Sequence, residues 1–173
     1  NGDVWFDRSI NAAKVLYWAG EDFNGLIERR TACMRHKGGC GVFSIGNDPL
    51  SLTSSQAADT LDALANVLRY ELTPSRLEDP LNYRSLPPVL IIDTWSMLTA
   101  SMDKNSGKDM SAAMATLRKL QTRVANLTII IIHHAGKDGS RGMRGHSSLL
   151  AAVDVAIEVD RSSKGLGRWT VRH

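Results

Sequence analysis

The sequence predicts an α/β fold with a mostly parallel β-sheet that is covered by helices on both faces. Apolar, β-favouring segments alternate along the chain with segments of helical periodicity. The apolar run VLIID lacks polar alternation, which is typical of a strand buried on both faces. The chain has 173 residues, of which 43% are hydrophobic, and this suits one domain with a substantial core.

Apolar runs predict the strands of this fold. They span residues 14–20, 40–45, 89–97, 127–132, 154–160 and 168–173. Consecutive isoleucines make up most of the fourth run, so we expect that strand to lie in a dry part of the sheet. The glycines of RSSKGLG separate the last two runs and suit a hairpin turn.

Periodic apolar side chains predict the helices between these strands. The predicted helices cover residues 23–34, 57–68, 110–124 and 147–152. The second helix has a single apolar stripe, and Ser54 or Ser55 is expected to cap its N-terminus. Residues 75–88 are expected to form a connector, and residues 99–111 a mobile loop.

The amino-acid composition restricts the classes of function that this protein could have. The net charge of +3 is compatible with a nucleotide or nucleic-acid partner but does not establish one. Aromatic residues make up only 6% of the chain, which disfavours a platform for stacking bases. The two cysteines do not form a disulfide framework, and the apolar runs are too short to span a membrane. We therefore expect a cytoplasmic protein that makes no membrane contact.

Cys33, His36 and Cys40 offer an alternative function as a zinc site, because these three soft ligands lie close together in the sequence. A structural zinc ion needs four ligands, and no convincing fourth ligand lies nearby. We therefore expect the cysteines to be small packing residues.

Polar side chains follow three of the predicted strands at their carboxyl ends, where α/β sheets bind ligands. Asp93 and Thr94 end the VLIID strand, and Asp93 suits Mg²⁺, which prefers oxygen ligands and keeps most of its waters. The alternative is a carboxylate that caps the next loop. Glu21 follows a neighbouring strand and could take a proton from an attacking water, as phosphoryl transfer requires.

His134 and a basic loop complete this group of residues. At the tip of the isoleucine strand, His134 could donate a hydrogen bond to a γ-phosphate, while His133 is expected to point to the opposite face. The alternative for a lone histidine is a core residue. Arg141 and Arg144 lie in a glycine-rich stretch and match phosphate oxygens, the alternative being two solvated side chains.

The motifs VLYWAGED, VLIIDT, IIIIHHAGKD and RGMRGHSSLLAAVD, in this order, resemble the RecA-like ATPases of the RepA type. These plasmid and phage replication proteins are related to hexameric DNA helicases of the DnaB class. The resemblance covers about residues 14–160 and implies a RecA-like three-layer domain. It also implies Mg²⁺ and ATP as cofactors, a homohexameric ring and single-stranded DNA as a partner.

The same resemblance implies a role for each matching residue. Glu21 corresponds to the catalytic glutamate, and Asp93, followed by Thr94, corresponds to the Walker B aspartate that holds Mg-ATP. His134 corresponds to the γ-phosphate sensor. Arg144 corresponds to the arginine finger offered to the adjacent subunit, with Arg141 as the second choice.

One motif of that family, the phosphate-binding sequence GxxxxGK[ST], does not occur in these 173 residues. Gly107 and Lys108 are followed by Asp109 and are expected to lie in a loop. We therefore expect either a motor domain whose P-loop unit precedes this segment, or a non-catalytic RecA-like module that lends Arg144 to a partner ATPase. The missing strand would leave a gap in the middle of the sheet.

These expectations set the domain boundaries. We expect residues 1–173 to form a single, partial RecA-like domain, with residues 1–13 as a linker after the missing unit and residues 161–173 as a truncated C-terminal hairpin. The basic side chains of the tail are the best placed to meet nucleic acid. They are Arg161, Lys164, Arg168 and Arg172.

Overall fold

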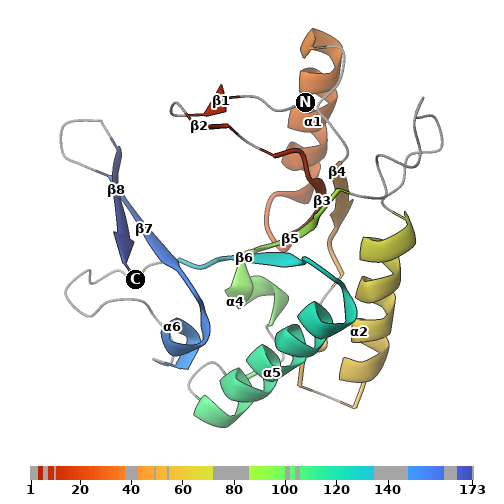
Figure 1. Cartoon of the computed structure of the whole chain (residues 1–173), viewed down its shortest axis with the longest axis vertical. Helices are drawn as coiled ribbons and strands as arrows, with labels where there is room; N and C mark the ends of the chain where they lie inside the picture. Colours follow the sequence, from red (N-terminus) through yellow and green to blue (C-terminus); the bar gives the residue numbers. More distant parts are fainter. Residues whose placement is uncertain are drawn as a thin grey trace.

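The computed structural model has an α/β order of elements (Figure 1). It describes residues 4–5, 8–9, 11–37, 43–48, 50–53, 55–71, 86–99, 102–103, 106–134, 148–161 and 167–172. The strands are β1 (Val4–Trp5), β2 (Arg8–Ser9), β3 (Lys14–Ala19), β4 (Phe43–Gly46), β5 (Pro88–Asp93), β6 (Thr128–Ile132), β7 (Ala156–Arg161) and β8 (Gly167–Arg172). The helices are α1 (Phe23–Lys37), α2 (Ala57–Asn66) with the π-helical turn η1 (Val67–Glu71), α4 (Trp95–Leu98), α5 (Gly107–Arg123) and α6 (Ser148–Ala152).

The central sheet has four parallel strands in the order β4-β3-β5-β6. The strands alternate with helices along the chain, so the predicted α/β class is confirmed. Two short antiparallel pairs, β1-β2 and β7-β8, lie outside this sheet in the described part of the chain. The second pair confirms the hairpin that the glycines near the C-terminus predict.

The hydrophobic core lies between the sheet and the layer of α2, α4 and α5 (Figure 1). Leu16, Leu90 and Ile92 point from the strands into this layer and are buried. The apolar stripes of α2 and α5 meet them there, as the helical spacing predicts. Burial of each such side chain contributes about 2 kcal/mol, so this layer supplies much of the stability of the fold.

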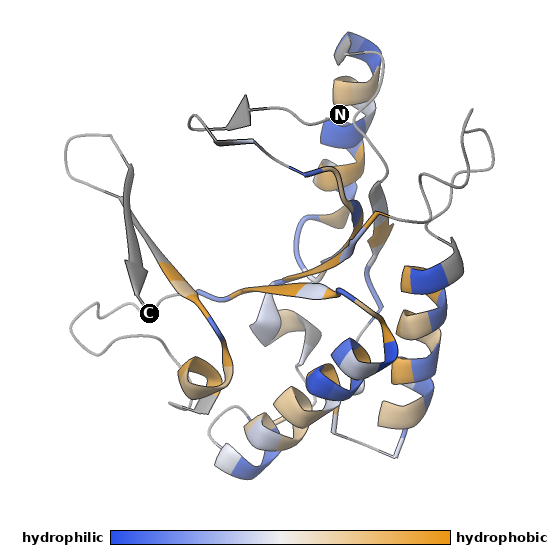
Figure 2. Cartoon of the chain, in the orientation of Figure 1, coloured by the Kyte–Doolittle hydropathy of each residue, from blue (hydrophilic) through white to orange (hydrophobic). Residues whose placement is uncertain are grey.

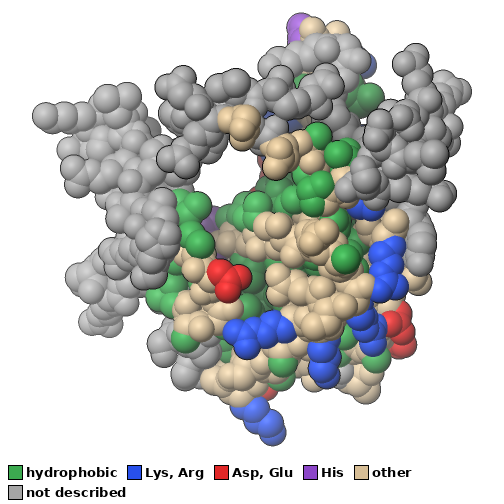
Figure 3. Space-filling model, viewed as in Figure 1, with side chains coloured by type: hydrophobic (Ala, Val, Ile, Leu, Met, Phe, Trp, Pro, Cys, Tyr) green, Lys and Arg blue, Asp and Glu red, His purple; other side chains and the backbone are tan. Residues whose placement is uncertain are grey.

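The opposite face of the sheet is covered by α1 and is less completely buried. Ile130 and Ile132 of β6 point to this face and are 45% and 37% exposed. The prediction that the isoleucine strand lies in a dry part of the sheet is therefore wrong for every second residue. In the described chain β6 pairs on one side only, with β5, and it forms an edge of the sheet. Most of its ribbon is coloured as hydrophobic (Figure 2), and hydrophobic side chains gather near the middle of the visible face (Figure 3).

Three predicted details differ from the structure. The run 89–97 is strand only to Asp93, because Thr94 is the N-cap of α4, which begins at Trp95. The residue that caps α2 is Gln56, without a side-chain hydrogen bond, so the predicted cap by Ser55 is wrong; Ser54 lies outside the described residues.

The third difference concerns the predicted loop 99–111, since α5 already begins at Gly107. Ser106 caps this helix, and its hydroxyl accepts a hydrogen bond from the backbone N–H of Asp109 at 3.3 Å. The carboxylate of Asp109, in the first turn, also interacts favourably with the helix dipole. Gly107 and Lys108 therefore lie in a helical turn. None of the helices in the described residues is long and apolar enough to cross a lipid bilayer.

Candidate functional site

The candidate site lies where β3, β5 and β6 end at the same edge of the sheet. In the register of the strands, Ala19 lies opposite Asp93, and Asp93 lies opposite Ile132. Glu21 and His134 each follow two residues after the last paired residue of their strands. Parallel pairing therefore brings the polar residues that follow three separate strands to one edge, as expected for an α/β sheet.

Glu21 makes contacts with the ends of both other strands. The Thr94 hydroxyl donates a hydrogen bond to Glu21 Oε1 at 2.8 Å, and Nε2 of His134 lies 3.4 Å from the same oxygen. Thr94 is buried, and its hydroxyl also lies 3.3 Å from that of Ser96. Since the side chains of Glu21 and His134 are 42% and 68% exposed, both remain accessible to a ligand.

The turn after β3 sets the position of Glu21. Asp22 has a φ of 49°, in the left-handed region that residues other than glycine seldom adopt. Its carboxylate pairs with Arg29 at 2.9 Å and lies over Gly25, where it leaves no room for a Cβ atom. The backbone carbonyl of Asp22 accepts from Leu26 N–H at 2.9 Å in the first turn of α1. The turn is thus held by α1 on its far side.

Asp93 is held from the neighbouring strand by Tyr17, whose hydroxyl donates a hydrogen bond to Asp93 Oδ2. Burial raises the pKa of Tyr17 to about 12; the hydrogen bond and the charge of Asp93 act in the same direction, while Arg29 opposes them. Tyr17 was not among the residues that the sequence predicted for the site. Its position in an apolar strand predicted a core residue. Its hydrogen bond to Asp93 depends on the register of β3 and β5, which the sequence does not reveal.

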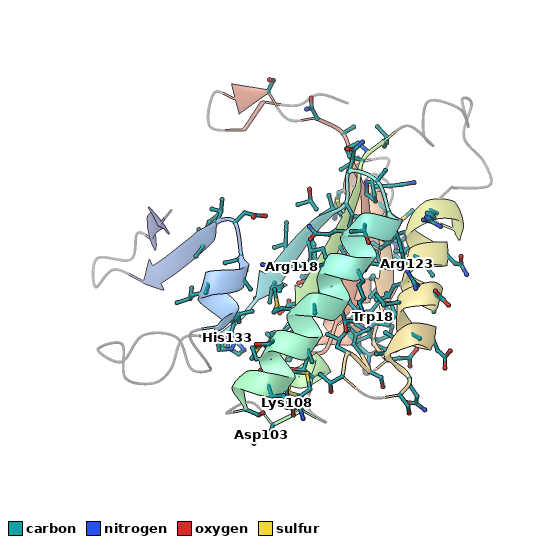
Figure 4. All side chains as sticks on the ribbon, turned by 60° about the horizontal axis from the view of Figure 1, so that its bottom comes forward. Trp18, Asp103, Lys108, Arg118, Arg123 and His133 are labelled. Carbon is teal, nitrogen blue, oxygen red and sulfur yellow. The ribbon has the colours of Figure 1, made fainter. Side chains whose placement is uncertain are left out.

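His133 and His134 differ in their surroundings. The Nδ1 atom of His133 lies 2.8 Å from the backbone oxygen of His134, whereas the His134 ring approaches Glu21. Figure 4 places His133 at the end of the molecule where Lys108 lies in the first turn of α5, far from Arg123. The sequence favoured His134 for the site, and the structure places that ring beside Glu21.

The remaining predicted residues are placed less fully. Arg141 and Arg144 lie outside the described residues, as do Cys40 and Lys164. Arg161, Arg168 and Arg172 lie on the β7-β8 hairpin. Among the described residues, no group of three histidine, cysteine, aspartate or glutamate side chains could hold a metal ion, and Cys33 is free.

Residues 1–140 match the AAA_25 family model, described as an AAA domain. The chain belongs to the AAA_25 family of RecA-like P-loop ATPases. A search of curated proteins found no match. The region shared with AAA_25 proteins includes Glu21, Asp93, Thr94 and His134, and ends just before Arg141.

The donor atoms at the strand ends fit Mg²⁺, which the AAA family generally binds together with ATP. Asp93 and Glu21 offer carboxylate oxygens, and Thr94 offers a hydroxyl. A hard cation prefers such oxygen ligands, and Mg²⁺ needs only one or two carboxylates because water and phosphate oxygens complete its shell.

Proposed function

We propose that this chain is an ATP-hydrolysing motor domain that uses Mg-ATP at the carboxyl ends of β3, β5 and β6. The observation that carries the proposal is the contact of Glu21 with both Thr94 and His134, next to Asp93. Two acids and an imidazole that are distant in the sequence share one accessible edge of a parallel sheet. Membership of the AAA_25 family supports ATP as the nucleotide.

Each residue has a distinct task in this proposal. Asp93 would hold Mg²⁺, which supplies charge neutralisation at the phosphates. Glu21 would accept a proton from the attacking water, and its hydrogen bond from Thr94 would fix the carboxylate in position. His134 is exposed beside Glu21 and would donate a hydrogen bond to the γ-phosphate, so that it responds to hydrolysis.

The arrangement of subunits is a second part of the proposal. The motifs of the RepA and DnaB type support a homohexameric ring in which Arg144, or else Arg141, reaches the nucleotide of the adjacent subunit. Hydrolysis in such a ring would drive movement along single-stranded DNA during replication. The basic residues of the C-terminal hairpin would then contact the single-stranded DNA.

The direct test is Mg²⁺-dependent ATP hydrolysis by the full-length natural polypeptide that contains this sequence. We expect Glu21→Gln to bind nucleotide but to lose roughly 100-fold or more in turnover, because a general base contributes that much. Asp93→Ala should abolish the metal-dependent rate. The matched control is Glu28→Gln, which neutralises an exposed acid on α1 and should leave turnover unchanged.

Full turnover by the Glu21→Gln protein would refute the assigned base. The finger is tested in mixed rings, where Arg144→Ala and Glu21→Gln subunits should together recover part of the activity that each lacks alone. If Arg141→Ala rather than Arg144→Ala complements, the finger is Arg141. Reversing the charges of the tail residues should lower the affinity for single-stranded DNA and flatten its salt dependence.

A further inference from the structure

Tyr17 lies one strand away from the carboxylate to which the proposed function assigns Mg²⁺. In the register, Tyr17 is opposite Ile91, so Asp93 is its diagonal neighbour on the same face of the sheet. Diagonal neighbours are within reach of long aromatic side chains. The contact is therefore built into the pairing of β3 with β5, which does not depend on a loop.

The direct neighbours of Asp93 on this face have no polar side-chain atoms. Ala19 lies opposite Asp93 on β3, and Ile132 lies opposite it on β6. In the described part of the chain, the side-chain hydrogen bond to the Asp93 carboxylate comes from Tyr17, and the nearby Thr94 hydroxyl is committed to Glu21. Within the described ranges, the phenol of Tyr17 thus orients the Asp93 carboxylate.

We infer that Tyr17 is a positioning residue, whose hydroxyl holds Oδ2 of Asp93 so that the second carboxylate oxygen is presented to Mg²⁺ and its waters. This inference rests on the proposed function, since it assigns the cation to Asp93. Groups that orient a metal ligand through a hydrogen bond fix its geometry and tune its basicity, and their removal weakens metal binding by about 10-fold to 100-fold.

The variant Tyr17→Phe tests the inference, because it removes the hydroxyl and keeps the ring that packs on the sheet. We expect the Mg²⁺ concentration for half-maximal ATP hydrolysis to rise about 10-fold, with turnover at saturating Mg²⁺ within about twofold of wild type. A second measurement needs no turnover: Mn²⁺ is titrated into the protein with ADP, and free Mn²⁺ is followed by electron paramagnetic resonance. Its dissociation constant should rise by a similar factor.

The matched control is Thr116→Val, which removes another hydroxyl that donates a hydrogen bond. Thr116 donates to the backbone oxygen of Leu52 at 2.8 Å, on the opposite face of the sheet from Asp93. This variant should lower the thermal unfolding temperature and leave both metal measurements unchanged. In the Asp93→Asn background, Tyr17→Phe should add no further weakening of Mn²⁺ binding, because the two residues act through one contact.

The outcomes separate this inference from the function on which it rests. If Asp93→Ala removes metal-dependent turnover while Tyr17→Phe leaves Mg²⁺ and Mn²⁺ dependence as in wild type, the positioning role is wrong and the proposed function stands. If Asp93→Ala itself retains turnover and Mn²⁺ affinity, the proposed function fails. A loss of thermal stability in Tyr17→Phe, without any change in metal dependence, also overturns the inference.

Discussion

The two faces of the four-stranded sheet have different contents. On the face toward α2 and α5, Leu16, Leu90 and Ile92 are almost completely buried. On the face toward α1, the same strands carry Tyr17 and Asp93, and β6 exposes Ile130. One face therefore stabilises the fold, and the other leaves room for polar chemistry beside the strand ends.

The site and the core are therefore built from the same strands, with side chains of opposite parity. In a strand, successive side chains point to opposite faces, so each residue before Asp93 belongs alternately to the core and to the site face. A shift of one residue in the pairing of β5 would send Asp93 into the core layer and bring Ile92 to the site. The dense packing of the core therefore fixes the register on which the site depends.

The largest predicted loss of stability comes from a substitution on the core face. Leu90→Ala removes a completely buried side chain and should lower the free energy of unfolding by about 3 kcal/mol, because it loses hydrophobic burial and leaves a cavity. Ile130→Ala, on the exposed side of β6, should cost less than about 1 kcal/mol. Urea denaturation monitored by circular dichroism measures both. Equal losses would show that the two faces are packed alike.

A smaller effect concerns the helix that covers the core face. Ser106→Ala removes the hydroxyl that accepts from Asp109 N–H and should destabilise the protein by about 1 kcal/mol. Ser111→Ala, at an exposed position inside the same helix, is the control and should be nearly neutral. Comparable losses for both variants in urea denaturation would argue against Ser106 as the N-cap of α5.

The smallest effect gives the two faces opposite pH dependence. Burial lowers the pKa of Lys14, which is buried on the core side of β3, so its destabilising contribution should diminish as the pH rises toward 10.5. The pKa of Tyr17 is raised from 10.0 to about 12, so its contribution should be present below pH 10 and fall between pH 10 and 12. The measurement is the difference in unfolding free energy between wild type and each variant as a function of pH. Relative to Lys14→Met, wild type should gain stability as the pH rises, and relative to Tyr17→Phe it should lose stability.

The sequence predicted the elements and the strand ends better than the contacts between them. The sequence placed Glu21, Asp93 and His134 at strand ends, because a polar residue after an apolar run marks the end of a strand. Tyr17 was missed because its partner lies 76 residues away and is set by the register. The start of α5 was missed because Gly107 and Lys108 suggested a loop, whereas Ser106 and Asp109 form a cap.

The exposure of β6 was not predictable from its composition either. Four isoleucines indicate an apolar strand. Whether each face of that strand is buried depends on the elements that pack against it. Ile129 and Ile131 pack against the core, whereas Ile130 and Ile132 point to the side that α1 leaves open. The apolar run therefore identified the strand but could not tell its two sides apart.

The hydrogen bond from Thr94 to Glu21 has a mechanical consequence. Thr94 is followed directly by Trp95, which starts α4 and is almost completely enclosed by the core. Any ligand that pulls Glu21 away from its resting position must break this bond or strain a segment anchored beneath the sheet. A ligand that displaced Glu21 would therefore also act on Thr94, which is joined directly to a residue that the core holds in place.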